Sequence, residues 1–499
     1  MSIINRTMYP VQTSMNLISK MQERFAQLQV QLGTGQKAST LAEMGSDRYF
    51  DLSIRSRISR IEGYKNNIDM VNLRLESFDQ VITRLDKVES DARAAIVTGN
   101  YGSSNVNFGT APQVAKSNLD EVINLLNTEV DGRYLFSGGK VDQRPVESLS
   151  AMLDGAAGKA GFKQVAAERL QADQGSGLGR LTLANVNNDV TLTEDGAHPF
   201  GFKLSTLTST SSNLTLTTPT GAAPRSLNIE VTAQPLENQI VTLGFTMPDG
   251  TEEHIQLKAV TGTAGAGEFQ IGADEDATAA NLAAALDTAL TTMADTQLAV
   301  ASNYAAANNF FNGQGQPVQR VLGPTFATAT SLVTADPTTT VLWYKGADAA
   351  DARASVKGKV DDAATISYGA QANESGPVEL IRSLAVLATQ SFTNADSTSA
   401  GRFNAVADRN YSRLSEVHNH ESGSIEMIGV ELGNAQVRVG GIEDRQTQYK
   451  SQLQGLLDNI ESVPKEDVAM EILALQTRLQ ASYQATSLIA SLSLTNYLK

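Results

Sequence analysis

The sequence predicts an α+β protein in which both chain termini form an elongated α-helical coiled-coil rod and a β-rich domain is inserted between them. Near both termini, apolar residues recur at three- and four-residue steps, which is typical of helices that pack on a partner. Between about residues 148 and 370, short threonine-rich runs of alternating polarity replace this pattern and indicate strands. The segment 151–370 holds 12 of the 39 basic and 22 of the 54 acidic residues. The flanks are therefore richer in charge of both signs, as expected for solvated helix faces.

Composition excludes several classes of protein. A chain of 499 residues is expected to form about two to four domains, and with only 6% aromatic residues its cores must rely on aliphatic side chains. The net charge of −15 argues against a nucleic-acid partner, which would require a basic face. The chain has no cysteine, no 18-residue apolar run and no secretory signal in its first ten residues. We therefore expect no membrane span, and either a cytoplasmic protein or one exported without a cleaved signal.

The first third of the chain is predicted to be helical. A helix is expected over 11–32, with glycines at 33 and 35 ending it and a loop over 38–47. A sustained heptad pattern predicts one helix over 49–98, roughly 75 Å long at 1.5 Å per residue. A breaker-rich turn region follows at 99–112, then a helix over 113–130 and a short strand beginning at 133.

In the middle segment, the alternating runs predict strands separated by turns. They lie at 181–186, 190–193, 214–218, 227–232, 241–247 and 254–260, and the turn at 248–250 indicates a hairpin. One helix is expected over 276–293, and the Gly-, Ala- and Asn-rich stretch 301–317 is expected to be a loop.

Helices resume near residue 377, and a second long seam runs over 425–460 until Pro464 breaks it. The terminal stretch 468–499 carries an apolar stripe that needs a partner, since each buried large side chain contributes roughly 1.5–3 kcal/mol. The stretch 11–32 carries a matching seam, so we infer that the two ends pair. The periodicity is equally compatible with helices that pack within one chain and with helices that other molecules complete.

Both ends of the chain resemble the flagellin superfamily. The stretch 28–37 (LQVQLGTGQK) is similar to the N-terminal signature of that family, and 475–483 through 492–494 is similar to its C-terminal signature. The stretch 131–138 (DGRYLFSG) is most similar to the hook-associated members, which join the flagellar hook to the filament. The resemblance covers roughly residues 1–145 and 375–499.

The resemblance implies a structural protein of the bacterial flagellum that joins hook to filament through coiled-coil packing; the alternative is flagellin, the main filament subunit. It implies a terminal assembly domain (1–40 with 465–499), a helical rod domain (41–147 with 371–464) and an outward-facing β-rich insert (148–370). The implied partners are copies of the same chain, an adjoining hook-associated protein, flagellin, an export chaperone and the flagellar type III secretion apparatus. The expected location is extracellular, in the flagellum, after secretion.

Apolar residues of the two terminal seams are the candidate assembly interface. Chain ends that become ordered only on assembly would offset the entropy cost of that ordering by burying apolar side chains between subunits. These residues are Phe25, Leu28, Leu32, Leu475, Leu479, Ile489 and Leu492. An ordinary intramolecular coiled coil is the alternative.

We expect no enzyme activity, cofactor or metal, because no catalytic constellation occurs in the sequence. His418 and His420 lack the third ligand of a zinc-binding helix, so a solvated helix end is the preferred interpretation. Asp274 and its acidic neighbours are expected to cap a helix rather than to bind calcium. Trp343 is expected to be a buried strand residue next to a boundary tyrosine, Tyr344, rather than a ligand-stacking platform. A surface adhesin role for the insert remains a further alternative.

Overall fold

The computed structural model describes residues 5–99, 109–312, 317–392 and 397–497, and for 5–11, 95–99 and 490–497 it describes only helical backbone. The predicted turn region at 99–112 lies largely outside the described residues. The chain divides into two compact units. We call Met1–Val71, Lys359–Thr365 and Val437–Lys499 the terminal unit, and Asn72–Gly358 and Ile366–Gln436 the central unit.

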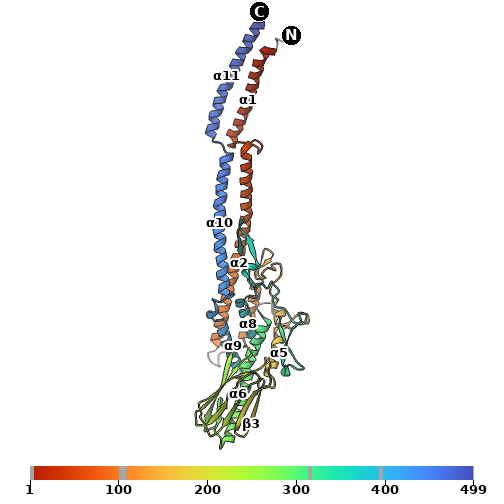
Figure 1. Cartoon of the computed structure of the whole chain (residues 1–499), viewed down its shortest axis with the longest axis vertical. Coiled ribbons are helices and arrows are strands. Elements are labelled where there is room, and N and C mark those ends of the chain that lie inside the picture. Colours follow the sequence, from red (N-terminus) through yellow and green to blue (C-terminus); the bar gives the residue numbers. More distant parts are fainter. Residues whose placement is uncertain (1–4, 100–108, 313–316, 393–396, 498–499) are drawn as a thin grey trace. The chain divides into compact units, whose positions relative to one another are not determined.

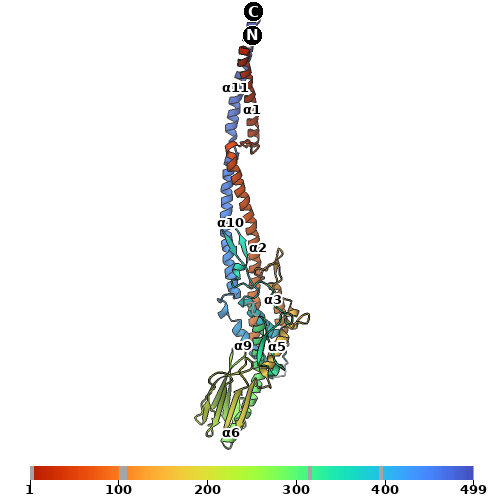
Figure 2. The ribbon, with the colours of Figure 1, turned by 45° about the vertical axis from the view of Figure 1, so that its right-hand side comes forward.

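The terminal unit is built from the helices at the two chain ends. Helix α1 (Asn5–Thr34) and helix α11 (Lys465–Tyr497) lie side by side, as both ribbon views show (Figures 1 and 2). Gly35 ends α1 in a left-handed conformation, with φ of 74°. The predicted pairing of the two ends is confirmed.

Two long helices continue the terminal unit and also contribute to the central one. They are α2 (Arg48–Gly99) and α10 (Ile425–Glu461), close to the predicted 49–98 and 425–460. Within the terminal unit, Ile54 and Ile61 of α2 pack against Leu453 of α10. The heptad pattern of these helices therefore reflects a contact within the chain.

In the central unit, helices surround the second half of α2. Its residues Leu75, Phe78 and Leu85 are at most 2% exposed. Helix α3 (Ala111–Leu126) packs on α8 (Ser375–Thr389), and α9 (Ser397–Arg413) packs on α8 as well. The end predicted for α3 was residue 130. That boundary was wrong because β1 (Glu129–Val130) pairs with β2 (Arg133–Tyr134) in a tight hairpin.

The middle segment contains two four-stranded sheets. One has the antiparallel order β3-β4-β7-β6; the other has the order β10-β9-β8-β5, with β10 parallel to β9. Six strands match the predicted runs, and β8 and β9 form the predicted hairpin. The strands are β3 Leu181–Val186, β4 Asp189–Glu194, β5 Lys203–Ser209, β6 Leu214–Thr217, β7 Ser226–Val231, β8 Ile240–Thr246, β9 Glu252–Val260 and β10 Glu268–Gln270.

Strand β5 was missed because its pairing with β8 shifts register between Leu204 and Thr206. A bulge places two residues opposite one and interrupts the alternation of buried and exposed positions. As a result, Leu204 and Leu207 are both buried although they lie three residues apart. A search for period-two alternation could not detect this strand.

Helix α6 (Glu275–Met293) contacts strands of both sheets, and all three elements share one hydrophobic core (Figure 1). The core includes Leu192, Leu243 and Leu286, each fully buried. Asp274 caps the helix by accepting the backbone N–H of Ala277 at 2.8 Å. The predicted capping role of the acidic cluster is therefore confirmed.

The prediction of a loop over 301–317 was wrong for 301–310, because α7 (Ala299–Phe310) follows α6 through a π-helical turn (Ala294–Leu298). The part of this prediction over 313–316 lies outside the described residues. The small residues of α7 allow close packing on almost every side, so the amphipathic period that marks a surface helix is absent. Phe310 and Phe311 contact Phe162 of α5 (Phe162–Gln174), another helix that the sequence did not reveal.

Shorter elements complete the described chain. The remaining helices are α4 Leu149–Asp154 and the 3-10 turns Gly45–Asp47, Phe326–Thr328, Arg353–Ser355 and Glu416–His418. The remaining strands are β11 Gln319–Leu322, β12 Ser331–Thr334, β13 Lys357–Lys359 and β14 Thr365–Ser367. Among the helices of the described residues, none is long and apolar enough to cross a membrane.

Trp343 is 2% exposed and packs edge-on against Phe311, with 5.9 Å between ring centroids. It lies in a bend rather than in a named strand, and Tyr344 is buried rather than at a boundary. The Tyr344 hydroxyl donates to the carbonyl of Ala347 at 2.7 Å. The aromatic pair is therefore part of the core.

Candidate functional site: the paired terminal helices and a charged pocket

The seam between α1 and α11 contains five of the seven predicted interface residues. Leu28 is fully buried, and Leu475 and Leu479 are each 9% exposed. Phe25 and Leu32 are partly buried against the same cluster. This placement favours the intramolecular alternative for these five side chains, because the helix partner within the same chain already covers them.

The other two predicted residues lie farther along α11. Ile489 is 40% exposed, so the seam does not cover it. The side chain of Leu492 lies outside the described residues. The assembly role of all seven residues stays a prediction.

Polar contacts flank the seam and fix the register of the two helices. Arg24 binds Glu471 at 3.0 Å, and the Gln22 side-chain amide donates to the Tyr483 hydroxyl at 2.7 Å. Arg24 and Glu471 are each about half exposed, and such ion pairs contribute only about 0.2–1 kcal/mol. Apolar burial therefore provides most of the stability of the helix pair, and the polar contacts provide alignment.

A short backbone pairing joins the end of α1 to the connection between α10 and α11. The N–H of Lys37 donates to the carbonyl of Glu461 at 2.6 Å, and the N–H of Val463 donates to the carbonyl of Gly35 at 3.0 Å. A Cβ at Gly35 would lie 3.3 Å from the Lys465 side chain, and its φ is positive. Glycine at this position thus suits both the turn and the close approach of the chains.

The paired helices also carry large apolar side chains that are exposed. Their exposed fractions range from 40% to 63%, although each would gain from burial. On α1 they are Met15, Leu17 and Val30, and on α11 they are Met470, Leu473, Tyr483, Leu488 and Ile489. These exposed side chains are the candidates for contact with another protein.

Charge is divided unequally between the two units. The terminal unit contains 16 basic and 15 acidic residues, a net charge of +1. The 23 basic and 39 acidic residues that remain give the central unit a net charge of −16. Copies of the terminal unit can therefore approach one another without net repulsion, whereas copies of the central unit repel.

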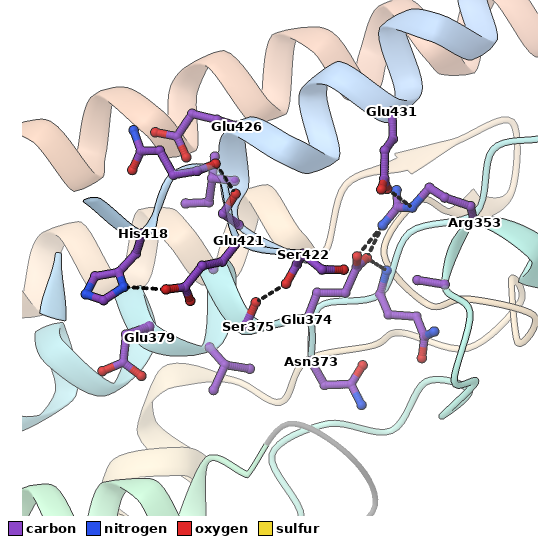
Figure 3. Close-up of a pocket in the computed structure, with 18 of the residues that line it drawn as sticks. Arg353, Asn373, Glu374, Ser375, Glu379, His418, Glu421, Ser422, Glu426 and Glu431 are labelled. Carbon is purple, nitrogen blue, oxygen red and sulfur yellow. Dashed lines mark hydrogen bonds and ion pairs between the residues drawn. The ribbon is translucent and has the colours of Figure 1, made fainter. Parts of the chain in front are cut away.

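A charged pocket of about 830 Å³ lies in the central unit (Figure 3). Arg353 forms ion pairs with both Glu374 and Glu431, and the Ser375 hydroxyl donates to the carbonyl of Ser422 at 2.9 Å. Burial raises the pKa of Glu374 even though Arg353 opposes the shift. Apart from Glu89, the lining residues come from several separate segments between positions 348 and 431, so no single sequence motif marks the pocket.

Other groups of the pocket also have shifted pKa values, among them Glu89 and His418. Burial, with a smaller contribution from Glu426, raises the pKa of Glu89 to about 7. The hydrogen bond from His418 Nδ1 to Glu421, 2.7 Å long, raises the pKa of His418. His418 lies at an exposed 3-10 turn, in agreement with the predicted solvated helix end. No group of three potential metal-ligating side chains occurs within the described part of the chain.

The start of the chain matches a known protein family. Residues 4–140 match the bacterial flagellin N-terminal helical region, and they make up about a quarter of the chain. No curated protein matches the chain. The family match supports a place in the flagellin superfamily and a structural protein of the bacterial flagellum. That family implies export and self-assembly into an extracellular flagellar polymer.

Proposed function

We propose, on the premise that the N-terminal quarter is of flagellin type, that this protein joins the flagellar hook to the filament by packing of its terminal helices. One observation carries the proposal: the α1–α11 pair has its own buried seam and still exposes large apolar side chains. A helix pair that serves only its own chain has no need of the second feature. The similarity of residues 131–138 to hook-associated members favours the junction over the filament.

The mechanism is adaptor geometry in two steps. Phe25, Leu28, Leu32, Leu475 and Leu479 hold the two helices together. The exposed residues of the pair, which include Ile489, then contact neighbouring subunits together with Leu492. We assign the assembly domain to 1–40 with 465–499, the rod to 41–147 with 371–464, and the outward-facing insert to 148–370.

Charge supports this direction of assembly. Packing through a unit of net charge +1 leaves the unit of net charge −16 free to face solvent, where repulsion among copies does not oppose the polymer. The partners would be other copies of this chain, an adjoining hook-associated protein and flagellin. An export chaperone would cover the apolar surface before passage through the flagellar type III secretion apparatus.

Localisation on cells tests the proposal. The chain has no cysteine, so one introduced thiol gives one labelling position. Ser212→Cys places it in an exposed turn, and Ser211→Cys is a matched control because Ser211 is only 8% exposed. Intact cells expressing each variant are treated with a thiol-reactive dye, and the unsubstituted strain gives the background.

We expect Ser212→Cys to give a single labelled spot at each boundary of hook and filament. Ser211→Cys should give a much weaker spot at the same place. Continuous labelling along the filament would overturn the junction role and support the alternative, flagellin. An unlabelled flagellum in a strain shown to export the protein would contradict both functions and support an adhesin role.

A further inference from the structure

Arg180 contacts three segments of the central unit through its guanidinium group. It is 5% exposed and lies just before β3. Its Nη1 donates to the carbonyls of Ala327 and Ala329 at 2.9 and 3.0 Å, and more weakly to that of Ala172 in α5 at 3.4 Å. Its Nε donates to Asp195 at 2.6 Å. The segments 195–202 and 327–329 are thus held through one guanidinium group.

His198 completes this arrangement. Its side chain is 2% exposed, and its Nε2 lies 2.6 Å from Asp195 Oδ1 and 2.9 Å from Arg180 Nη2. The backbone N–H of Phe200 donates to its Nδ1 at 3.3 Å. The contacts with Asp195 and Phe200 assign the neutral tautomer, in which the proton on Nε2 is donated to Asp195 and Nδ1 accepts from Phe200. Arg180 Nη2 can only donate, so in this tautomer it lies in close contact with Nε2 without a hydrogen bond to it.

Adding a proton to this imidazole removes an interaction and adds a buried charge. Protonated Nδ1 would direct its N–H toward the N–H of Phe200, which would lose its acceptor. The new cation would face Arg180 and would compete with it for Asp195. A buried donor left without an acceptor costs roughly 1–3 kcal/mol, and a buried unpaired charge costs more.

The charged groups around His198 do not compensate for that change. Asp195 already pairs with Arg180, and Glu194 accepts the N–H groups of Leu204 and Arg225. Asp173 pairs with Arg169 of the same helix and accepts the N–H of Gly201. Asp195, Arg180 and Lys203 act on the charge of His198, whereas Glu194 and Asp173 act on that of Lys203.

Lys203 adds a second cation near the imidazole. Its Nζ is buried and has no hydrogen-bond partner within the described residues. Burial is the largest cause that lowers the pKa of Lys203, and burial, Arg180 and Lys203 together lower that of His198 despite Asp195. Each of these effects favours the neutral imidazole.

We propose that the Arg180–Asp195–His198 cluster is an acid-sensitive lock. Protonation of His198 withdraws Asp195 from Arg180 and releases the loop 195–202, and with it the segment 327–329, from the end of α5. The β-rich part of the central unit thereby becomes more mobile in mild acid while its hydrophobic core stays intact.

The direction of the pH dependence follows from linkage. Because the folded-state pKa of His198 lies below its ordinary value of 6.5, the unfolded or opened state binds more protons in acid. The stability that the lock contributes is complete above pH 6.5 and is lost as the pH falls toward the folded-state pKa. Between these two pH values, the equilibrium constant for opening rises by up to about tenfold for each unit by which the pH falls.

Hydrogen exchange of the full-length protein between pH 7.5 and pH 5 tests the lock. Exchange is corrected for its intrinsic pH dependence, and peptides from 195–202 and 327–329 are compared with control peptides from strand β8, Ile240–Thr246. We expect several-fold more opening in acid for the two locked segments than for β8. His198→Gln should remove most of that difference, whereas His254→Gln, at an exposed histidine, should retain it.

Histidine NMR of the unsubstituted protein provides a second test that does not depend on whether a variant folds. The chain has four histidines, and the titration of His198 is expected to have a midpoint below 6.5. A midpoint at or above 6.5 would overturn the proposal. Equal acid-induced opening in β8, or full pH dependence retained in folded His198→Gln, would also overturn it.

Discussion

At the scale of single residues, side chains of similar type on the same helix differ in burial. Leu28 and Val30 lie two positions apart on α1, yet the first is fully buried and the second is 51% exposed. Glu76 and Glu89 both lie on α2, yet the first is exposed and the second is half-buried beside Glu426. Such pairs offer matched comparisons, because the helix and the residue type stay constant while the surroundings change.

Leu28→Ala is expected to weaken the pairing of α1 with α11 by roughly 2–5 kcal/mol, because it leaves a cavity in the seam. The measurement is the free energy of opening of α11 over residues 468–479, from hydrogen exchange of the monomer. Val30→Ala is the control and should change it by no more than about 0.5 kcal/mol. Equal effects of the two substitutions would show that the seam is not formed in solution.

Glu89→Gln is expected to stabilise the central unit at pH 8 and to have little effect at pH 4. The folded-state pKa of Glu89 is raised to about 7, so the stability that its protonated form contributes is present below 4.5 and lost as pH rises through 7. At pH 8 the native protein must hold an ionised, half-buried carboxylate beside Glu426, and glutamine removes that cost of about 1–3 kcal/mol.

Chemical denaturation of the central unit at both pH values measures the effect of Glu89→Gln. Glu76→Gln, on the exposed surface of the same helix, should show no comparable change with pH. An increase in stability of the same size at pH 4 and pH 8 would contradict the assigned ionisation.

At the scale of elements, ionic contacts attach helices to the sheets. Arg409 of α9 binds Asp249 at 2.9 Å and donates to the Thr251 hydroxyl at 2.9 Å, both in the turn between β8 and β9. It also donates to the side chain of Gln297 at 2.9 Å. The Asp249 side chain is fully buried, so its charge depends on this arginine.

Arg409→Met is expected to destabilise the β8–β9 hairpin by roughly 3–5 kcal/mol, because Asp249 would remain buried without its partner. The free energy of opening of residues 246–252, from hydrogen exchange, measures this loss. Asp408→Asn, at the exposed neighbouring position, is the control. The double variant Arg409→Met with Asp249→Asn should recover part of the stability; no recovery would mean that lost packing, not the unpaired charge, causes the effect.

At the scale of the whole molecule, the two units differ in net charge. The terminal unit is nearly neutral and exposes leucine and methionine side chains, whereas the central unit is strongly acidic. This combination favours association through one part of the chain and solvation of the other.

Leu473→Asp is expected to leave the monomer folded, because Leu473 is 63% exposed. It should reduce incorporation into the polymer at least about tenfold, because adding a charge to an apolar contact costs more than about 1.4 kcal/mol. Incorporation is measured as the ratio of assembled to exported protein. Gln476→Asp introduces the same charge at an exposed polar position of α11 and is the control. Unchanged incorporation of the Leu473 variant would remove this face from the proposed interface.

The sequence alone determined the elements whose side-chain spacing is regular. The long helices, six strands, the β8–β9 hairpin and the cap at Asp274 were all predicted, because each depends on periodicity or on chemistry within a few residues. The pairing of the chain ends was also predicted, because two apolar stripes of similar length each required a partner.

Only the tertiary structure decided features that depend on distant contacts. Strand β5 was hidden by its bulge, and α7 by burial on nearly all sides, since both disrupt the period that a sequence search uses. Leu28 and Leu473 are both leucines on amphipathic helices, yet one is buried and the other exposed. The charged pocket and the Arg180–Asp195–His198 cluster join side chains from separate segments, and their burial and pKa shifts arise from neighbours that only the folded chain brings together.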